Sequence, residues 1–381
     1  MTIAPDIPAE LAATPASDAV ACHASRPELA REPLAADVTW PSAERRAAFD
    51  AWFAALDPAL QLDGATLVPA SADASFRRYL RVQGARASHI VMDAPPPQED
   101  VRPFVRIAGL IRQAGLHAPA VLAADEAQGF LLLEDLGNEL YLDACRDPQR
   151  ANALMRKALA ALLQWQLKMP ADDLPPFSDT LLRQELALFP EWCVQREFGV
   201  TWTERQQAVW NQTCDRLVAS ALAQPQVAVH RDWMPRNLMV CSPGRPGILD
   251  FQDAVRGPLT YDLACQLRDA FIDWDEAQEL DWAVRWWQQA RAAGAPLGEV
   301  FENDFGEFWR ALEWMGLQRH LKVLGIFCRL KHRDGKPRYA TDLPRFFQYT
   351  TRVAMRYAPL RPLLQLLEPL SGQAVEAGYT F

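Results

Sequence analysis

The segment VAVHRDWMPRNLMV at residues 227–240, followed by GILDFQDA at residues 247–254, is the most informative part of the chain for its fold. Together they place His230, Arg231, Asp232, Asn237 and Asp250 in an ordered series. Two apolar runs flank a Pro/Gly turn, so the segments predict a hairpin beside which the polar residues gather. A loop with incidental acidic residues explains this spacing less well than a shared chemical task does.

Phosphoryl transfer is a task that needs this set. It requires a carboxylate that orients or accepts the proton of the attacking hydroxyl, and oxygen ligands that hold magnesium on the nucleotide phosphates. We predict that Asp232 is the catalytic carboxylate and that Asn237 and Asp250 are the metal ligands. Arg236 lies between them in sequence, and we expect it to steady the transferring phosphoryl group. The expected cofactors are therefore ATP and Mg²⁺.

The series is similar to the protein-kinase pattern H-R-D-x-x-x-x-N with its downstream Asp-Phe-Gly, which here reads Asp250-Phe251-Gln252. The chain then runs directly into GPLTYDLA at residues 257–264, which leaves no room for a long activation segment and favours a small-molecule phosphotransferase. Asp262 is the N-cap of the next helix or, by resemblance to kinase-like phosphotransferases, a support of the catalytic loop, and it can serve as both. We assign His230 the same supporting role.

Strand and helix signals are unevenly distributed along the chain. Extended segments are predicted at residues 65–71, 76–83, 88–95 and 130–136, with one helix at residues 102–116. Beyond Gly137, amphipathic helical segments such as residues 151–169 and 305–330 dominate. We therefore expect an α+β, protein-kinase-like two-lobe fold, with a β-rich N-lobe at residues 42–136 and a mainly helical C-lobe at residues 137–381. Residues 1–41 are rich in Ala and Pro and are expected to form a flexible extension.

The N-lobe departs from the kinase pattern at the phosphates. Where a glycine-rich loop would stand, the chain has SADASFRR, in which Ser75, Arg77 and Arg78 are our candidate phosphate contacts. Strand alternation sends Arg77 to one face and Arg78 to the other, and a solvated strand face is an equal alternative for each. The strand that should carry a lysine has Met92 and Asp93 instead. Either another cation takes the role of the lysine, with Arg77 and Arg78 as the candidates, or the protein binds nucleotide weakly.

The strand end LEDLG at residues 133–137 resembles the hinge whose backbone binds adenine. On that resemblance, Glu134 and Leu136 are expected to offer backbone hydrogen bonds to the nucleotide base.

The amino-acid composition indicates which kinds of binding partner and which cellular compartment to expect. The 381 residues are 50% hydrophobic and carry a net charge of -9, which opposes a nucleic-acid partner. Seven cysteines without a C-x-x-C pair favour a reducing compartment. There is no secretory signal and no apolar run of the ~18 residues that a membrane helix needs. We expect a cytoplasmic monomer or weak dimer without a membrane or nucleic-acid partner.

Several segments together carry a family resemblance: SADASFRRYLRV, IVMDAPP, FLLLEDLG, ELALFPEW, HRDWMPRNLMV, GILDFQDAVRGPLTYDLA and LQRHLKVLGIFCRL. They resemble the bacterial anomeric kinases of N-acetylmuramate and N-acetylglucosamine, a branch of the aminoglycoside-phosphotransferase superfamily, over most of the chain from about residue 46. The resemblance implies transfer of the ATP γ-phosphoryl group to the C1 hydroxyl of an amino sugar, during peptidoglycan recycling. A missing strand lysine is ordinary in that family.

Sugar contacts are predicted at Asp253, Glu185, Trp192 and Arg319. For the last three, packing or surface exposure is an equal alternative, and Arg319 could bind the lactyl carboxylate of N-acetylmuramate. Two other functions remain open from the sequence. One is phosphorylation of an aminoglycoside, choline or homoserine, and the other is a non-catalytic nucleotide-binding module.

Overall fold

The computed structural model describes residues 22–24, 37–72, 76–241 and 244–371, and these form two compact units. The first unit comprises residues 1–170, 230–254 and 271–275, and the second comprises residues 171–229, 255–270 and 276–381. These boundaries differ from the predicted lobe boundary between residues 136 and 137. The reason is backbone pairing, because Ile248 N–H donates to the His117 carbonyl at 2.8 Å and Val240 N–H to the Glu139 carbonyl at 2.8 Å. The central hairpin therefore belongs to the unit that holds the sheet.

An antiparallel sheet of five strands is the centre of the first unit, in the order β2-β3-β4-β6-β5. The strands are β2 (Asp63–Ala72), β3 (Arg78–Gln83), β4 (Ser88–Asp93), β5 (Val121–Asp125) and β6 (Phe130–Glu134). Four of them confirm the predicted extended segments. The sequence prediction missed β5, whose VLAAD contains two alanines, a residue type depleted in strands.

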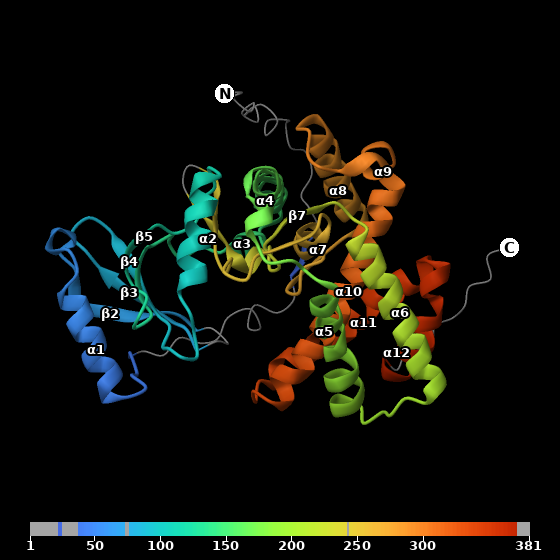
Figure 1. The fold of residues 1–381 in the computed structure, drawn as a ribbon, viewed down its shortest axis with the longest axis horizontal. Coiled ribbons are helices and arrows are strands. Elements are labelled where there is room, and N and C mark those ends of the chain that lie inside the picture. Colours follow the sequence, from blue (N-terminus) through green and yellow to red (C-terminus); the bar gives the residue numbers. More distant parts are fainter. Residues whose placement is uncertain (1–21, 25–36, 73–75, 242–243, 372–381) are drawn as a thin grey trace. The chain divides into compact units, whose positions relative to one another are not determined.

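Two helices, α1 (Ala43–Ala54) and α2 (Arg102–Gln113), lie on opposite sides of this sheet (Figure 1). On the α1 side, Phe49 and Trp52 pack on Leu80, Val82 and other strand residues in one apolar cluster. Residues 38 and 40 also pack against this cluster. The ordered fold therefore begins before residue 42, because Val38 and Trp40 supply apolar surface that the Ala/Pro-rich composition of the segment hides.

The first unit also contains the hairpin formed by β8 (Leu238–Val240) and β9 (Pro246–Ile248), which confirms the predicted one. The other elements are β1 (Cys22–Ala24), η3 (Pro58–Leu60), α3 (Tyr141–Ala144), α4 (Pro148–Lys168), η6 (Pro235–Asn237) and β11 (Ile272–Trp274). Strand β1 pairs antiparallel with β11. Within the predicted flexible extension of residues 1–41, three residues thus have a strand partner that composition cannot reveal. Residues 1–21 and 25–36 lie outside the described part of the chain.

The second unit is mainly helical. Its elements are η4 (Ala171–Asp173), α5 (Asp179–Leu188), the π-helix η5 (Phe189–Glu197), α6 (Glu204–Leu222), β7 (Gln226–Val229), β10 (Val255–Pro258), α7 (Tyr261–Leu267), α8 (Glu276–Ala292), α9 (Gly298–Asn303), α10 (Phe305–His332), η7 (Pro337–Asp342), α11 (Leu343–Arg356), η8 (Ala358–Leu363) and α12 (Leu364–Ser371). Helix α10 packs against α5, α6, α7 and α11. A Cβ on Gly325 would lie 2.4 Å from the Leu188 carbonyl carbon, so glycine lets α10 approach α5 closely.

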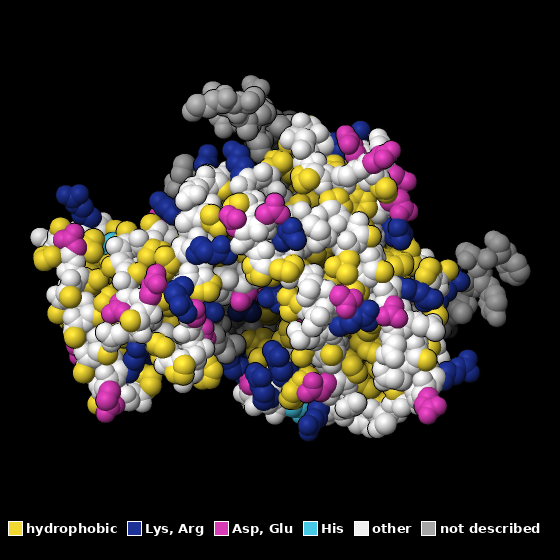
Figure 2. All heavy atoms as spheres, viewed as in Figure 1, with side chains coloured by type: hydrophobic (Ala, Val, Ile, Leu, Met, Phe, Trp, Pro, Cys, Tyr) yellow, Lys and Arg dark blue, Asp and Glu magenta, His cyan; other side chains and the backbone are white. Residues whose placement is uncertain are grey.

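The surface mixes both signs of charge. On the face shown in Figure 2, Lys and Arg side chains are interspersed with Asp and Glu side chains. An extended basic surface of the kind that tracks a nucleic-acid backbone is not present among the described residues on this face. Within the same part of the chain, every helix is too short or too polar to cross a bilayer.

Candidate active site

A network of hydrogen bonds joins the two ends of the central hairpin. Buried His230 donates from Nε2 to the Leu249 carbonyl at 3.0 Å and accepts at Nδ1 from the Asp232 backbone N–H at 3.3 Å. Asn237 donates from Nδ2 to the Asp232 carbonyl at 2.9 Å. The Leu249 N–H then donates to the Asn237 carbonyl at 2.9 Å. These bonds tie Asp232 and Asn237 to the residue that precedes Asp250.

The two bonds of His230 fix its neutral tautomer, with the proton on Nε2. The ring packs against Trp165 and Trp233, with centroids 5.4 Å and 5.5 Å away. Burial lowers the pKa of His230 from 6.5 to about 4, although the carboxylates of Asp232 and Asp253 act in the opposite direction. A neutral, immobile imidazole suits the supporting role predicted for His230, because it holds the loop without competing for a proton near pH 7.

His230 makes the stability of the protein depend on pH. Its folded pKa is below the unfolded value, so the unfolded state binds more protons between pH 6.5 and about pH 4, and stability falls as pH is lowered through that window. Between about pH 7.5 and about pH 4.5, the wild type should lose on the order of 2 kcal/mol more unfolding free energy than His230→Gln, which keeps a donor for Leu249. Urea unfolding at both pH values measures this difference.

Buried His320 also has a lowered pKa, but it is present in both proteins and cancels from the comparison. Equal losses in wild type and variant would show that His230 is not the group that titrates.

Asn237 and Asp250 fit the role of cation ligands. Because Asn237 commits its amide nitrogen to the Asp232 carbonyl, its side-chain oxygen is the atom suited to a metal ion. Asp250 lies at the end of the returning strand, and its Oδ1 accepts from Gln252 Nε2 at 2.9 Å. An amide oxygen and a carboxylate are ligands that Mg²⁺ accepts. The residues present therefore suit this metal.

Two backbone conformations mark the same loop as strained. Arg231 has a φ of 78° and Asp250 a φ of 59°, in the left-handed region that non-glycine residues rarely adopt. Each such residue costs on the order of 1 kcal/mol, and such strain concentrates at functional sites. The strained positions adjoin Asp232 and coincide with Asp250, the two carboxylates assigned to chemistry.

Arg236 and Asp253 are placed near these groups along the chain. Arg236 is partly buried, and its guanidinium lies 5.0 Å from the ring centre of Phe271. Asp253 is exposed, and its Oδ2 accepts from Gln252 Nε2 at 3.3 Å. Gln252 thereby links the side chains of Asp250 and Asp253. The substrate and phosphoryl roles of Arg236 and Asp253 stay predictions.

The two arginines predicted to contact phosphate, Arg77 and Arg78, bind different carboxylates. Arg77 donates from Nε to Glu99 Oε2 at 2.8 Å. Arg78 instead donates to the Asp93 carboxylate and lies 4.7 Å from the Trp40 ring centre. Arg78 thus lies on the α1 side of the sheet, where Asp93 and Trp40 contact its guanidinium, and its nucleotide contact stays a prediction. Ser75 lies outside the described residues.

The predicted hinge follows β6. The Glu134 carboxylate accepts from the Ala120 N–H at 3.0 Å and lies 3.1 Å from His117 Nε2, and the Glu134 backbone N–H donates to the Ala120 carbonyl at 2.9 Å. The backbone contact of Glu134 with a base stays a prediction. The Leu136 side chain packs against the hairpin, since a Cβ on Gly247 would come within 2.7 Å of it. The hairpin therefore lies directly beside the segment that we assign to adenine.

Arg81 was not predicted as a site residue, yet it fixes the hinge backbone. It donates to both carboxylate oxygens of Asp135, at 2.6 Å and 3.0 Å, and to the Gly137 carbonyl at 2.9 Å. Ser88 Oγ also donates to Asp135 at 2.6 Å. Burial would raise the pKa of Asp135, but the bonds from Arg81 and Ser88 outweigh it and hold that pKa below its ordinary value. No sequence motif indicates this partner, because Asp135 lies 54 residues from Arg81 along the chain.

Arg81→Ala should lower the free energy of unfolding by about 2 kcal/mol, because it leaves a buried carboxylate without its main partner. We also expect KM for ATP to rise severalfold with kcat little changed, since the loosened segment binds the base and not the reacting phosphate. Urea unfolding and initial rates measure the two effects. An unchanged KM for ATP would remove Arg81 from the nucleotide site.

Two predicted sugar contacts are buried inside the second unit. Glu185 is 5% exposed and accepts from Lys322 Nζ at 2.8 Å and from the Tyr261 hydroxyl at 3.4 Å. Arg319 is 3% exposed and donates to the Arg268 carbonyl at 3.1 Å. For both residues these bonds favour the packing alternative.

Trp192 and Asp262 also belong to the second unit. Trp192 lies in the π-helix η5, is partly exposed, and has the Arg196 guanidinium 5.9 Å from its ring centre. Asp262 is fully buried in the first turn of α7, whose N-cap is Thr260. The N-cap interpretation of Asp262 is therefore wrong, and the loop-supporting role stays a prediction.

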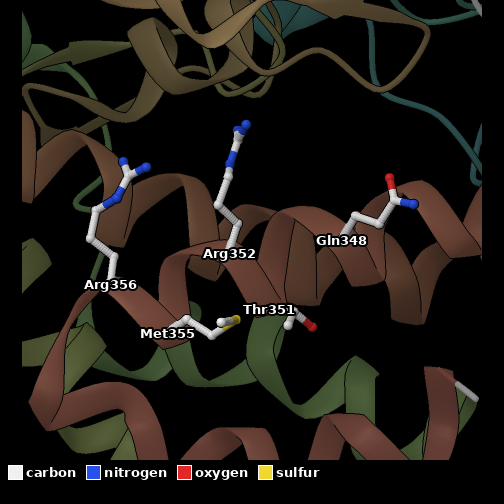
Figure 3. Close-up of a pocket in the computed structure, with 5 residues that line it drawn as sticks. All are labelled: Gln348, Thr351, Arg352, Met355 and Arg356. Atoms are coloured by element: carbon white, nitrogen blue, oxygen red, sulfur yellow. The ribbon is translucent and has the colours of Figure 1, made fainter. Parts of the chain in front are cut away.

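A hollow of about 480 Å³ runs along α11, lined by Gln348, Thr351, Arg352, Met355 and Arg356. Figure 3 shows the two arginines pointing to the same side of the helix. Their charges are balanced within the second unit, because Arg356 pairs with Glu276 and with Glu313, and Arg352 lies 3.7 Å from Glu276. Both arginines thus lie beside carboxylates of their own unit, and we assign no ligand to the hollow.

The sheet unit with its polar hairpin and the helical unit together define a phosphotransferase of protein-kinase-like architecture. The chain belongs to the phosphotransferase enzyme family abbreviated APH, whose profile matches residues 66–299. It is 52% identical over 313 residues to the N-acetylmuramate/N-acetylglucosamine kinase of Pseudomonas aeruginosa, a match that covers 82% of this chain and 90% of the relative. The kinase of the same name from Pseudomonas putida is 51% identical over 315 residues, covering 82% of this chain and 91% of the relative.

The solved structures confirm the predicted fold class. ADP-bound aminoglycoside phosphotransferase APH(2'')-Ib superposes with a TM-score of 0.52 at 12% identity, covering 82% of this chain and 99% of that one. At such low identity the likeness establishes the fold alone.

Proposed function

We propose that this protein is an ATP-dependent kinase that phosphorylates the C1 hydroxyl of N-acetylmuramate, N-acetylglucosamine or both. The observation that carries the proposal is the hydrogen-bond network that ties Asp232 and Asn237 to the strand end before Asp250. The names of the relatives from the two Pseudomonas species support the acceptor. The resulting sugar 1-phosphate suits the recycling of peptidoglycan sugars.

The reaction assigns a separate task to each residue. Asp232 accepts the proton of the C1 hydroxyl as that oxygen bonds to the γ-phosphorus and the bond to ADP breaks. Asn237 and Asp250 hold Mg²⁺, which when bound offsets negative charge on the phosphate oxygens. Arg236 donates to the transferring group. His230, neutral near pH 7, keeps Asp232 in place through the backbone and takes no part in proton transfer.

Two exposed or partly exposed side chains keep their assignment to the sugar. Asp253 is exposed and follows the proposed metal ligand Asp250 closely in sequence, so its carboxylate can accept from a sugar hydroxyl. Trp192 is partly exposed and offers an aromatic face on which a sugar ring can pack. Both contacts are tested by the change that a substitution makes in KM for the sugar.

The test of the whole proposal is an acceptor panel in which ADP release is measured with Mg²⁺ and ATP. N-Acetylmuramate and N-acetylglucosamine are compared with kanamycin, choline and homoserine, and the product is examined by ³¹P and ¹H NMR. We expect turnover with at least one amino sugar and a phosphate coupled to the anomeric proton. Phosphate on O6 would reject the anomeric assignment. Turnover only with a cationic acceptor, or ATP binding without any turnover, would reject the sugar kinase itself.

A further inference from the structure

Strand β4, all of which the structure describes, ends without a cation for the phosphates of a nucleotide. Its last two residues are Met92 and Asp93, both buried, and neither can donate to a phosphate. Asp93 instead binds Arg45 at 2.5 Å and also pairs with Arg78. These two arginines are thus engaged on the α1 side of the sheet. Strand β4 itself therefore supplies no cation for the phosphates.

Arg77 is held by a partner that no sequence motif indicates. Its Nε donates to Glu99 Oε2 at 2.8 Å, and the side chains are only 14% and 12% exposed. Glu99 belongs to the loop between β4 and α2, and its N–H donates to the Pro95 carbonyl at 3.2 Å, which closes a turn. An arginine has five N–H donors, so a guanidinium fixed through Nε can still donate to a phosphate.

Two observations relate the pair to the segment that contains Asp250, one of the two proposed metal ligands. Burial alone would lower the pKa of Arg77, but the Glu99 hydrogen bond and the charges of Glu99 and Asp250 outweigh it and raise that pKa. Arg77 is therefore within electrostatic reach of Asp250. Phe104, in the first turn of α2, meets the same segment, since its ring centre is 4.7 Å from that of Phe251. The loop that bears Glu99 is thereby anchored beside the site.

We propose that Glu99 is a positioning residue that aims Arg77 at the phosphates of bound ATP, in place of a strand lysine. This inference rests on the proposed function for its nucleotide. A buried ion pair is weak evidence of stabilisation in itself, because desolvation offsets much of the attraction. Stabilisation of the fold therefore does not account for the Arg77–Glu99 pair, whereas orientation of Arg77 toward a bound phosphate does.

The test measures binding of Mg–ATP by isothermal titration without an acceptor, for Glu99→Gln, Arg77→Ala and the double variant. We expect each single variant to weaken binding at least ~10-fold, the scale of a charge-assisted hydrogen bond, and the double variant to be no weaker than Arg77→Ala. KM for the sugar should change less than about twofold. Asp100→Asn, which removes the adjacent exposed carboxylate, serves as the matched control and should bind ATP as the wild type does.

Glu99→Asp keeps the negative charge on a shorter side chain and should bind Mg–ATP more tightly than Glu99→Gln does. This variant also provides a test if Glu99→Gln fails to fold. Wild-type ATP affinity in folded Glu99→Gln or in Arg77→Ala would overturn the inference, and so would fully additive losses in the double variant. Because the binding readout needs no acceptor, a protein that binds ATP but phosphorylates neither sugar would refute the proposed function and leave this test intact.

Discussion

Replacing Asp232 with Asn should lower turnover at least ~10²-fold while Mg–ATP binds as it does to the wild type. The loss follows because an amide cannot accept the proton of the attacking hydroxyl. The loop should keep its conformation, since Asp232 meets His230 and Asn237 through its backbone N–H and carbonyl, which the substitution retains. A decrease of this size corresponds to about 2.7 kcal/mol in the activation barrier.

Initial rates of ADP release at saturating sugar, together with titration calorimetry for Mg–ATP, measure both halves of this result. Asp172→Asn is the control, because that side chain is 92% exposed and pairs with Arg256 on the surface. Near-normal turnover in Asp232→Asn would remove Asp232 from the mechanism. A joint loss of turnover and of ATP binding would make it a structural residue instead.

Asp250→Asn should reduce turnover by about 10² to 10³-fold and shift activation by Mg²⁺ to higher concentration. Asp250 supplies the full negative charge of the proposed ligand pair, and Asn237 supplies a neutral oxygen. An asparagine at this position still tolerates the left-handed backbone, which Asn and Asp adopt more readily than most residues. The effect therefore reports on charge and not on backbone strain.

Rates at a series of Mg²⁺ concentrations separate Asp250 from its neighbour. Asp253→Asn should leave the Mg²⁺ dependence unchanged and raise KM for the sugar, because Asp253 is assigned to the acceptor. If Asp250→Asn required no more Mg²⁺ than the wild type, the metal-ligand assignment would be wrong.

The sequence predicts the catalytic hairpin well because its information is local. Asp232 and Asn237 are five residues apart, and the apolar runs on either side specify the strands that bring Asp250 back to them. The network in the structure links the same segments that this spacing brings together, through His230 and the Leu249 backbone. Convergence of the three side chains on one ion stays a prediction.

Contacts between distant residues could not be predicted in the same way. Arg81 meets Asp135 across 54 positions, and Arg77 meets Glu99 across 22, and neither pair has a spacing that a motif records. The sequence also does not show that Glu185 and Arg319 are buried. In the structure both side chains form hydrogen bonds inside the second unit. The alternation of residues along a strand predicts on which face of the sheet a side chain lies. The residue that this side chain contacts depends on the tertiary fold.

Binding of Mn²⁺ in the presence of ATP, followed by electron paramagnetic resonance, tests most directly whether Asn237 and Asp250 share one metal centre beside Asp232. We expect Asp250→Asn and Asn237→Ala each to weaken Mn²⁺ binding at least ~10-fold, and Asp232→Asn to bind the ion as the wild type does. Wild-type Mn²⁺ affinity in both Asp250→Asn and Asn237→Ala would show that these residues are not the metal ligands.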